Sequence, residues 1–182
     1  RSRFPADRSQ PFAELPDGRV YSYADLEAIS ARYAHLLRQS GVTPGDRVAA
    51  QVEKSPESLF LYLACLRAGA AFLPLNTAYQ QAEIDYFLED AGPTCLVCRP
   101  EDLAELAPRA SACGARIVLT LDAEGGGSLS ERSRALPETF DNVVRQPDDM
   151  VAILYTSGTT GRSKGAMLSG GNLASNADAL HR

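Results

Sequence analysis

The sequence predicts an α/β fold, in which a layered α/β subdomain contains a largely parallel sheet. Two observations lead to this prediction. Short apolar segments alternate along the chain with longer segments in which apolar side chains recur every three or four positions. Glycine, proline and asparagine residues separate the two kinds of segment. Strands that alternate with helices usually form a parallel sheet covered by helices, and ligands bind beyond the carboxyl ends of its strands.

Turn and capping signals place the first elements. Residues 1–16 are polar and interrupted by prolines, so they are expected to form an irregular lead-in. Asp17-Gly18 predicts a turn between short extended segments. Ser22 and Asp25 have the spacing of a capping box, which predicts a helix after them. Gly41 is expected to stop this helix.

The second helix has the strongest start signal in the chain. Ser55-Pro56-Glu57 places a capping hydroxyl before a proline and an acidic residue, and Gly69 is expected to end the helix. The other elements are predicted from their apolar patterns. Strands are expected at 47–52, 71–75, 94–98, 116–121 and 150–155, and helices at 83–89 and 101–107, the latter broken near Pro108. Residues 122–147 are expected to be the least structured part.

The composition is that of a globular protein and argues against several functions. The chain has 182 residues, of which 45% are hydrophobic and 23% are charged, and its net charge is −5. An acidic chain without a basic run does not suit nucleic-acid binding. No apolar segment approaches the roughly 20 residues that span a membrane, and the first residues do not resemble a signal peptide. We therefore expect a cytoplasmic protein.

The four cysteines are expected to be buried thiols. Cys95 and Cys98 form a CxxC pair, but no second pair follows. A tetrahedral zinc site needs four ligands, and the histidines at 35 and 181 lie far from this pair in the sequence. We therefore predict no metal site among these residues.

The candidate functional site is the segment from Ile153 to Leu168. A predicted strand ends there in a loop of glycine and hydroxyl residues with one lysine, and a second short strand follows. Glycines let backbone N–H groups approach a ligand, hydroxyls donate hydrogen bonds without charge, and a lysine adds one positive charge, so the combination suits a polyphosphate. The candidate binding residues are Thr156, Ser157, Gly158, Thr159, Thr160, Gly161 and Lys164.

Two other interpretations of this loop are less well supported. In a P-loop of the GxxxxGK[ST] type that begins at Gly158, Ser163 replaces the second glycine and Gly165 replaces the hydroxyl that binds magnesium. A plain hairpin turn is the other alternative, but such a turn needs only one or two special residues. This loop has five hydroxyl residues and three glycines, and its lysine is one of only two in the chain.

The segment from Tyr155 to Gly165, Tyr-Thr-Ser-Gly-Thr-Thr-Gly-Arg-Ser-Lys-Gly, resembles the AMP-binding signature of the adenylate-forming superfamily. This superfamily includes acyl-CoA synthetases, nonribosomal adenylation domains and luciferases. Residues 21–26, 45–49 and 67–76 are similar to the N-terminal region of the same family. The resemblance implies that residues 17–182 are the N-terminal part of an AMP-binding (acyl-CoA synthetase) domain, truncated at its C-terminal end.

Within the superfamily, three segments are most similar to malonyl-CoA synthetases, namely residues 50–55, 74–79 and 166–176. This similarity implies malonate or methylmalonate as the acid. A medium-chain or aryl acyl-CoA ligase is the alternative, because the residues that contact the acyl group lie further along the family's chain. One departure is visible after Ser169, where the family often has a histidine and a polar residue. Gly170-Gly171 stands there instead, and we expect it to loosen the start of the last helix.

The resemblance also implies a reaction and its small-molecule partners. Such ligases activate a carboxylate with ATP as an acyl-adenylate, release pyrophosphate and transfer the acyl group to the thiol of coenzyme A. The hydroxyls and N–H groups of the loop would hold the β- and γ-phosphates, and Lys164 would offset the charge on the leaving pyrophosphate. Mg²⁺ would be bound by a residue of the family's threonine–glutamate motif, which this sequence lacks. No nucleic-acid or membrane partner is implied.

Other family motifs are also missing from the sequence, among them the adenine-binding and ribose-binding motifs and the C-terminal catalytic lysine. The chain begins at Arg1 rather than at a methionine and ends at Arg182 inside a helical pattern. We therefore expect an N-terminal fragment of a longer enzyme that is inactive alone. For the fragment itself, a non-catalytic nucleotide-binding module is the alternative.

Overall fold

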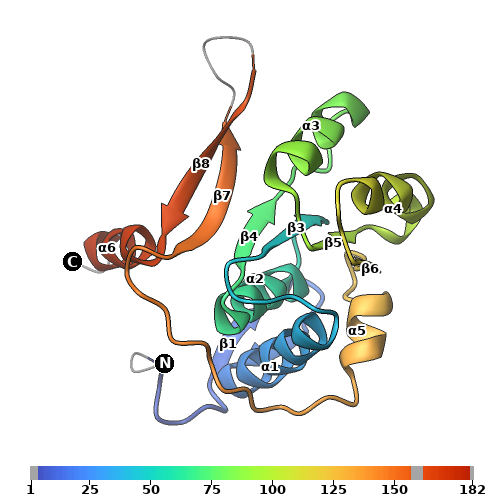
Figure 1. Cartoon of the computed structure of the whole chain (residues 1–182). Helices are drawn as coiled ribbons and strands as arrows, with labels where there is room; N and C mark the ends of the chain where they lie inside the picture. The colour runs from blue at the N-terminus through green and yellow to red at the C-terminus, as the bar shows by residue number, and fades with distance from the viewer. Residues whose placement is uncertain (1–3, 157–161, 181–182) are drawn as a thin grey trace.

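Six strands form one sheet in the computed structural model, which describes residues 4–156 and 162–180 (Figure 1). The strands are β3 (Arg47–Gln51), β4 (Ala71–Pro74), β5 (Cys95–Cys98), β6 (Ile117–Thr120), β7 (Met150–Thr156) and β8 (Lys164–Ser169). Their order in the sheet is β6-β5-β3-β4-β7-β8, and only β8 runs antiparallel to its neighbour. The predicted α/β fold with a largely parallel sheet is therefore confirmed.

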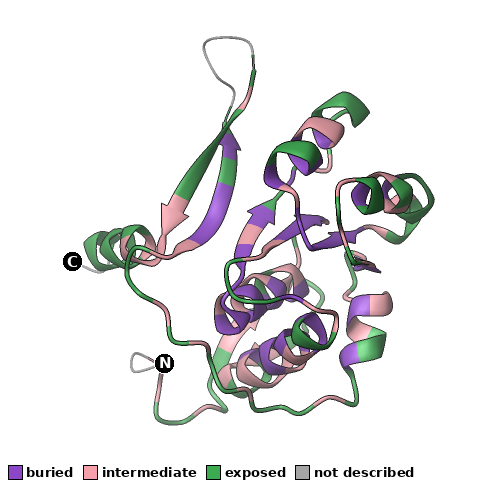
Figure 2. Cartoon of the chain, viewed as in Figure 1, coloured by how far each residue is buried: buried purple, intermediate pink, exposed green. Residues whose placement is uncertain are grey.

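Helices cover both faces of this sheet. On one face lie α1 (Tyr23–Gln39), α2 (Pro56–Ala68) and α5 (Ser128–Ser133), and on the other lie α3 (Gln81–Ala91) and α4 (Leu103–Ala112). The strands contribute to both cores in alternation. Val48 and Ala50 belong to the first core, whereas Ala49 between them belongs to the second. Because successive side chains of a strand point to opposite faces, strands buried on both sides (Figure 2) are almost continuously apolar.

The predicted helix starts are present. The Ser22 hydroxyl accepts a hydrogen bond from the backbone N–H of Asp25, and the Asp25 carboxylate accepts one from the backbone N–H of Ser22. Ser55 caps α2 in the same way, with Pro56 in the first turn. Gly69 ends α2 with a φ of 78°, a left-handed conformation that costs glycine little.

Two segments are more regular than the sequence indicates. Residues Pro11–Glu14 form β1 within the expected irregular lead-in, and this strand pairs with β2 (Val20–Ser22). Helix α5 lies within residues 122–147, the segment expected to be least structured. Its Leu129 is fully buried in the first core. A helix of six residues has no apolar repeat long enough to detect, so burial of this leucine rather than local propensity explains the helix.

The expected helix break near Pro108 is wrong. After a 3₁₀ turn at Pro100–Asp102, α4 continues past the proline to Ala112. A proline inside a helix removes one backbone hydrogen bond and crowds the carbonyl four residues before it. Here Leu106 and Ala110, on either side of Pro108, are both buried in the second core, and this packing outweighs the local cost.

The last helix, α6 (Gly170–Leu180), begins at the glycine pair that was expected to loosen it. The Gly170 N–H donates to the Asp149 carbonyl at 3.0 Å, and the Gly171 N–H donates to the Pro147 carbonyl at 2.7 Å. A Cβ atom on Gly171 would lie only 3.2 Å from the same Pro147 oxygen. Gly171 therefore permits a close approach to the chain that precedes β7, whereas Gly170 leaves room for a Cβ atom.

Three of the four cysteines are buried as expected, and Cys113 is partly exposed. Burial raises the pKa of Cys95 to about 12, so this thiol stays protonated at neutral pH. Within residues 4–156 and 162–180, no group of three or more His, Cys, Asp or Glu side chains is arranged to hold a metal ion. The same residues include no helix that is long and apolar enough to span a membrane.

Candidate functional site

The two ends of the hydroxyl-rich segment lie on β7 and β8, which pair as a hairpin at the carboxyl edge of the sheet (Figure 1). The last pair of its ladder joins Thr156 to Lys164, and both residues are exposed. The structure therefore brings together the first and last of the seven candidate residues. The other five lie outside the described residues, namely Ser157, Gly158, Thr159, Thr160 and Gly161.

The hairpin is attached to the parallel strands only near its base. The ladder between β4 and β7 contains one residue pair, Phe72 with Ala152. Within the described part of the chain, residues 153–156 of β7 pair with β8 alone. The end that carries the loop thus extends beyond the sheet and needs another support (Figure 1).

Helix α3 supports this end of β7 through Tyr155. The Tyr155 ring packs on Phe87, with 4.2 Å between ring centroids. Its hydroxyl donates a hydrogen bond of 2.5 Å to Oδ2 of Asp90. Burial and this hydrogen bond both raise the pKa of Tyr155 well above its usual value, so the phenol stays a neutral donor at physiological pH.

The same helix contacts the chain on the other side of the loop. The Tyr86 hydroxyl donates a hydrogen bond of 3.0 Å to the carbonyl oxygen of Ser163. The guanidinium of Arg162 lies over the Tyr86 ring, 5.0 Å from its centroid, within the range of a cation–π interaction. Helix α3 therefore contacts the residues directly before Thr156 and directly before Lys164.

The hairpin tip carries two positive charges that have no carboxylate partner among the residues that the structure describes. Arg162 and Lys164 are both exposed, and neither forms an ion pair within residues 4–156 and 162–180. Unpaired cations beside hydroxyl groups favour an anionic ligand, because charge-assisted hydrogen bonds to phosphate are stronger than neutral ones.

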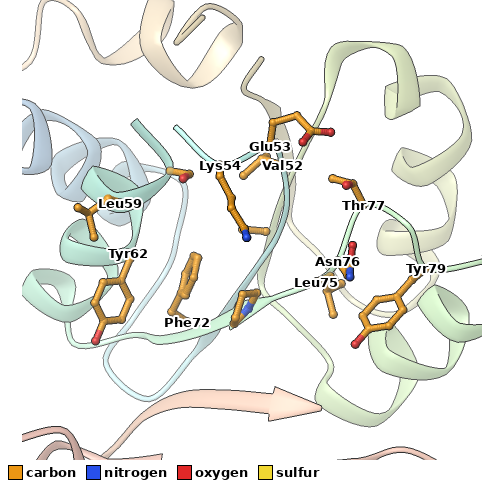
Figure 3. A pocket seen from close by; sticks show the side chains of 13 residues that line it. Val52, Glu53, Lys54, Leu59, Tyr62, Phe72, Leu75, Asn76, Thr77 and Tyr79 are labelled. Carbon is orange, nitrogen blue, oxygen red and sulfur yellow. The ribbon is translucent and has the colours of Figure 1, made fainter. Parts of the chain in front are cut away.

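A cavity of about 840 Å³ opens at the same edge of the sheet, where β3 and β4 end (Figure 3). Apolar side chains form part of its lining, among them Leu59, Tyr62 and Phe72. Polar side chains also contribute, among them Glu53, Lys54, Asn76 and Thr77. Figure 3 shows the Lys54 side chain extending into this space between Phe72 and Asn76. An apolar lining with a few polar groups is typical of sites for organic ligands.

Sequence reasoning does not identify this cavity. Glu53 and Lys54 have the pattern of solvated surface charges, and Tyr62 and Tyr86 have that of core or boundary aromatics. The one available signal is the position of the polar residues, which follow directly after two strands whose carboxyl ends share an edge. The support from Tyr86 and Asp90 has no sequence signal, because both residues are far from the loop along the chain.

Comparison with known proteins finds similarity to one enzyme family along nearly the whole chain. The family model described as AMP-binding enzyme matches residues 2–182. Feruloyl-CoA synthase from Amycolatopsis sp. is 38% identical over 159 residues, which are 87% of this chain and 30% of that protein. Indoleacetate–CoA ligase from Aromatoleum aromaticum is 37% identical over 163 residues, which are 87% of this chain and 32% of that protein.

Among solved structures, ATP-bound MatB from Rhodopseudomonas palustris matches with a TM-score of 0.93 and 50% sequence identity. The match covers 97% of this chain and 35% of the MatB chain. The present chain thus spans 30–35% of the length of these relatives.

Proposed function

The chain belongs to the AMP-binding enzyme family, and on this premise we propose that the whole protein is an ATP-dependent acyl-CoA synthetase. It activates a carboxylate by attack on the α-phosphate of ATP, releases pyrophosphate and transfers the acyl group from the adenylate to coenzyme A. The observation that carries this proposal is the pairing of Thr156 with Lys164 at the base of the hydroxyl-rich loop.

In this proposal the loop holds the β- and γ-phosphates of ATP. Residues directly opposite in an antiparallel ladder have Cβ atoms about 4.5–5.5 Å apart on one face of the sheet. The Thr156 hydroxyl and the Lys164 ammonium can therefore converge on one phosphate group. Ser157, Thr159 and Thr160 add hydroxyl donors, and the N–H groups around Gly158 and Gly161 add backbone donors.

Lys164 has a further role when the bond to the leaving group breaks. Negative charge then grows on the pyrophosphate, and a positive group already held in place stabilises that charge more than it stabilises bound ATP. Lys164 is the proposed catalytic residue in this chain for this reason. Its neighbour Arg162 increases the positive potential at the same tip.

Mg²⁺ and coenzyme A are the other proposed small molecules. Mg²⁺, when bound, neutralises phosphate charge. The resemblance to the family implies that a residue of its threonine–glutamate motif, which this sequence lacks, would bind Mg²⁺. The cavity beside Lys54 provides room for part of an organic substrate at the same edge of the sheet. A cytoplasmic location is proposed with this metabolic role.

We propose malonate or methylmalonate as the carboxylic acid. The support is the resemblance of residues 50–55, 74–79 and 166–176 to malonyl-CoA synthetases. A medium-chain or aryl acyl-CoA ligase is the second candidate. The aromatic side chains of Tyr62 and Phe72 in the cavity and the two aryl-acid relatives favour it.

Pyrophosphate release by the whole protein tests both the proposed synthetase reaction and the proposed acid. ATP and coenzyme A are supplied with malonate, methylmalonate, acetate or ferulate in separate reactions. We expect malonate or methylmalonate to be used at least about tenfold faster than acetate, a difference of about 1.4 kcal/mol in transition-state binding. Malonate no better than acetate excludes the proposed acid, and preference for ferulate supports the second candidate. Absence of acid-dependent pyrophosphate release with all four acids excludes a synthetase that uses these acids.

The 182-residue chain alone requires a separate measurement. Calorimetric titration with ATP, together with a pyrophosphate-release assay, distinguishes an inactive part of an enzyme from a nucleotide-binding module. We expect no turnover by this chain, and detectable pyrophosphate release by it would contradict that expectation.

A further inference from the structure

One face of helix α3 contacts the chain on both sides of the phosphate loop, at Tyr155 in β7 and at Ser163 just before β8. Tyr86 and Asp90 are four residues apart, so their side chains lie on the same side of the helix. Tyr86 bonds to the chain that leaves the loop, and Asp90 bonds to the strand that enters it. A single rigid element therefore fixes the position of both ends of the loop.

These two contacts are directional, unlike the packing between them. Phe87 packs against the Tyr155 ring and supplies apolar contact, but this contact does not fix the orientation of the ring. The hydrogen bond from Tyr155 to Asp90 fixes the direction of the ring, and with it the end of β7. The hydrogen bond from Tyr86 reaches a main-chain carbonyl, that of Ser163, which lies just outside β8.

The sheet does not fix this part of the hairpin. The one residue pair between β4 and β7 lies four residues before Thr156, at Ala152. Asp90 itself is exposed, and its carboxylate accepts a hydrogen bond from the buried Tyr155. This contact is therefore not a consequence of burying Asp90. The β7–β8 ladder pairs Thr156 with Lys164, and the contacts of α3 therefore decide where this pair stands relative to the rest of the sheet.

We infer that Tyr86 and Asp90 are positioning residues for ATP, which set the geometry of the phosphate loop without touching the nucleotide. This inference rests on the proposed phosphate-binding function of the loop. Small displacements of a binding group are costly, since a shift of about 1 Å can reduce a rate about a hundredfold. Loss of either directional contact should weaken ATP binding while leaving the acid site unchanged.

The test uses the whole protein with the variants Tyr86→Phe and Asp90→Ala. Tyr86→Phe keeps the ring beside Arg162 and removes only the bond to Ser163, and Asp90→Ala changes an exposed residue, so both are expected to fold. The matched control is Tyr33→Phe, which also removes one tyrosine hydroxyl bond, to Ser130, between α1 and α5 on the other face of the sheet.

Three measurements are made on each variant: hydrogen exchange of the segment 153–168 without nucleotide, calorimetric Kd for ATP, and KM for ATP and for the acid in pyrophosphate exchange. We expect exchange in the segment to be about two- to tenfold faster in both variants, as the loss of one hydrogen bond implies. We expect Kd and KM for ATP to rise about five- to tenfold and KM for the acid to stay within about twofold, because a misplaced phosphate-binding group affects the nucleotide alone. Tyr33→Phe should leave all three measurements at wild-type values.

Two results would overturn the inference. The first is unchanged exchange of the segment 153–168 in both Tyr86→Phe and Asp90→Ala. The second is equal loss of ATP affinity in Tyr33→Phe, which would indicate general destabilisation. Hydrogen exchange needs neither nucleotide nor turnover, so it decides the positioning role even if the protein releases no pyrophosphate with any acid.

Discussion

Replacement of Lys164 by alanine separates the proposed catalytic role of this residue from its place in the fold. Lys164 is exposed, and its backbone, not its side chain, pairs with Thr156. Alanine keeps the backbone hydrogen bonds, so the free energy of unfolding should change by less than about 0.5 kcal/mol. Loss of one preorganised group at a developing negative charge costs about 2.7–4 kcal/mol, which corresponds to a rate about 100- to 1,000-fold lower.

Exchange of labelled pyrophosphate into ATP by the whole protein measures this step, at a saturating concentration of the acid. Arg38→Ala is the control, because it also removes an exposed cation but lies on α1, on the other face of the sheet. It should leave the exchange rate unchanged. Lys164→Arg should recover only part of the rate, because a planar guanidinium does not replace a compact ammonium. Adenylation at a near-normal rate in Lys164→Ala would refute the role assigned to this residue.

Three further predictions concern the fold that supports the loop. Leu129→Ala should lower the free energy of unfolding by about 2–5 kcal/mol in urea titrations, because this side chain is fully buried, whereas Leu103→Ala, 37% exposed, should cost far less. Gly69→Ala should cost at least about 1–2 kcal/mol in the same assay, since its φ is +78° and its Cβ would lie 2.9 Å from Val143; an unchanged free energy of unfolding would contradict the strain expected at this turn. Burial raises the pKa of Tyr33 to about 12, so its contribution to stability should be complete below about pH 10 and lost as the pH rises toward about 12. Unfolding midpoints measured across that range should fall less steeply in Tyr33→Phe.

Elements with strong local signals were predictable from the sequence. The caps at Ser22 and Ser55 connect groups only three residues apart, so their partners can be read directly from the chain. The apolar run at Cys95–Cys98 becomes a strand buried on both faces, as such a run predicts. In these cases the residues that decide the structure are neighbours in the sequence.

Elements that depend on distant contacts were not predictable in the same way. Helix α5 forms because Leu129 reaches the core, and α4 continues past Pro108 because Leu106 and Ala110 are buried. Neither effect has a signal within a few residues. Local propensity is a weak prior that tertiary packing readily overrides.

In the candidate site, too, the residues close together in the sequence were predictable and the contacts between distant residues were not. Composition was enough to select the loop and its ends, Thr156 and Lys164, because glycine, hydroxyl and lysine residues lie together in the chain. The contacts that hold the loop were not visible. Tyr86 is 77 residues from Ser163, and Asp90 is 65 residues from Tyr155. No spacing rule connects residues so far apart, and only the packing of α3 beside the hairpin brings them together.

The central claim is that the hairpin between β7 and β8 holds the phosphates of ATP. A crystal structure of the whole protein with ATP tests this claim most directly, through the distance from Lys164 Nζ to the nearest β- or γ-phosphate oxygen. We predict a charge-assisted hydrogen bond of about 2.7–2.9 Å, with the Thr156 hydroxyl on the same phosphate group. ATP bound with its phosphates away from this hairpin would contradict the claim.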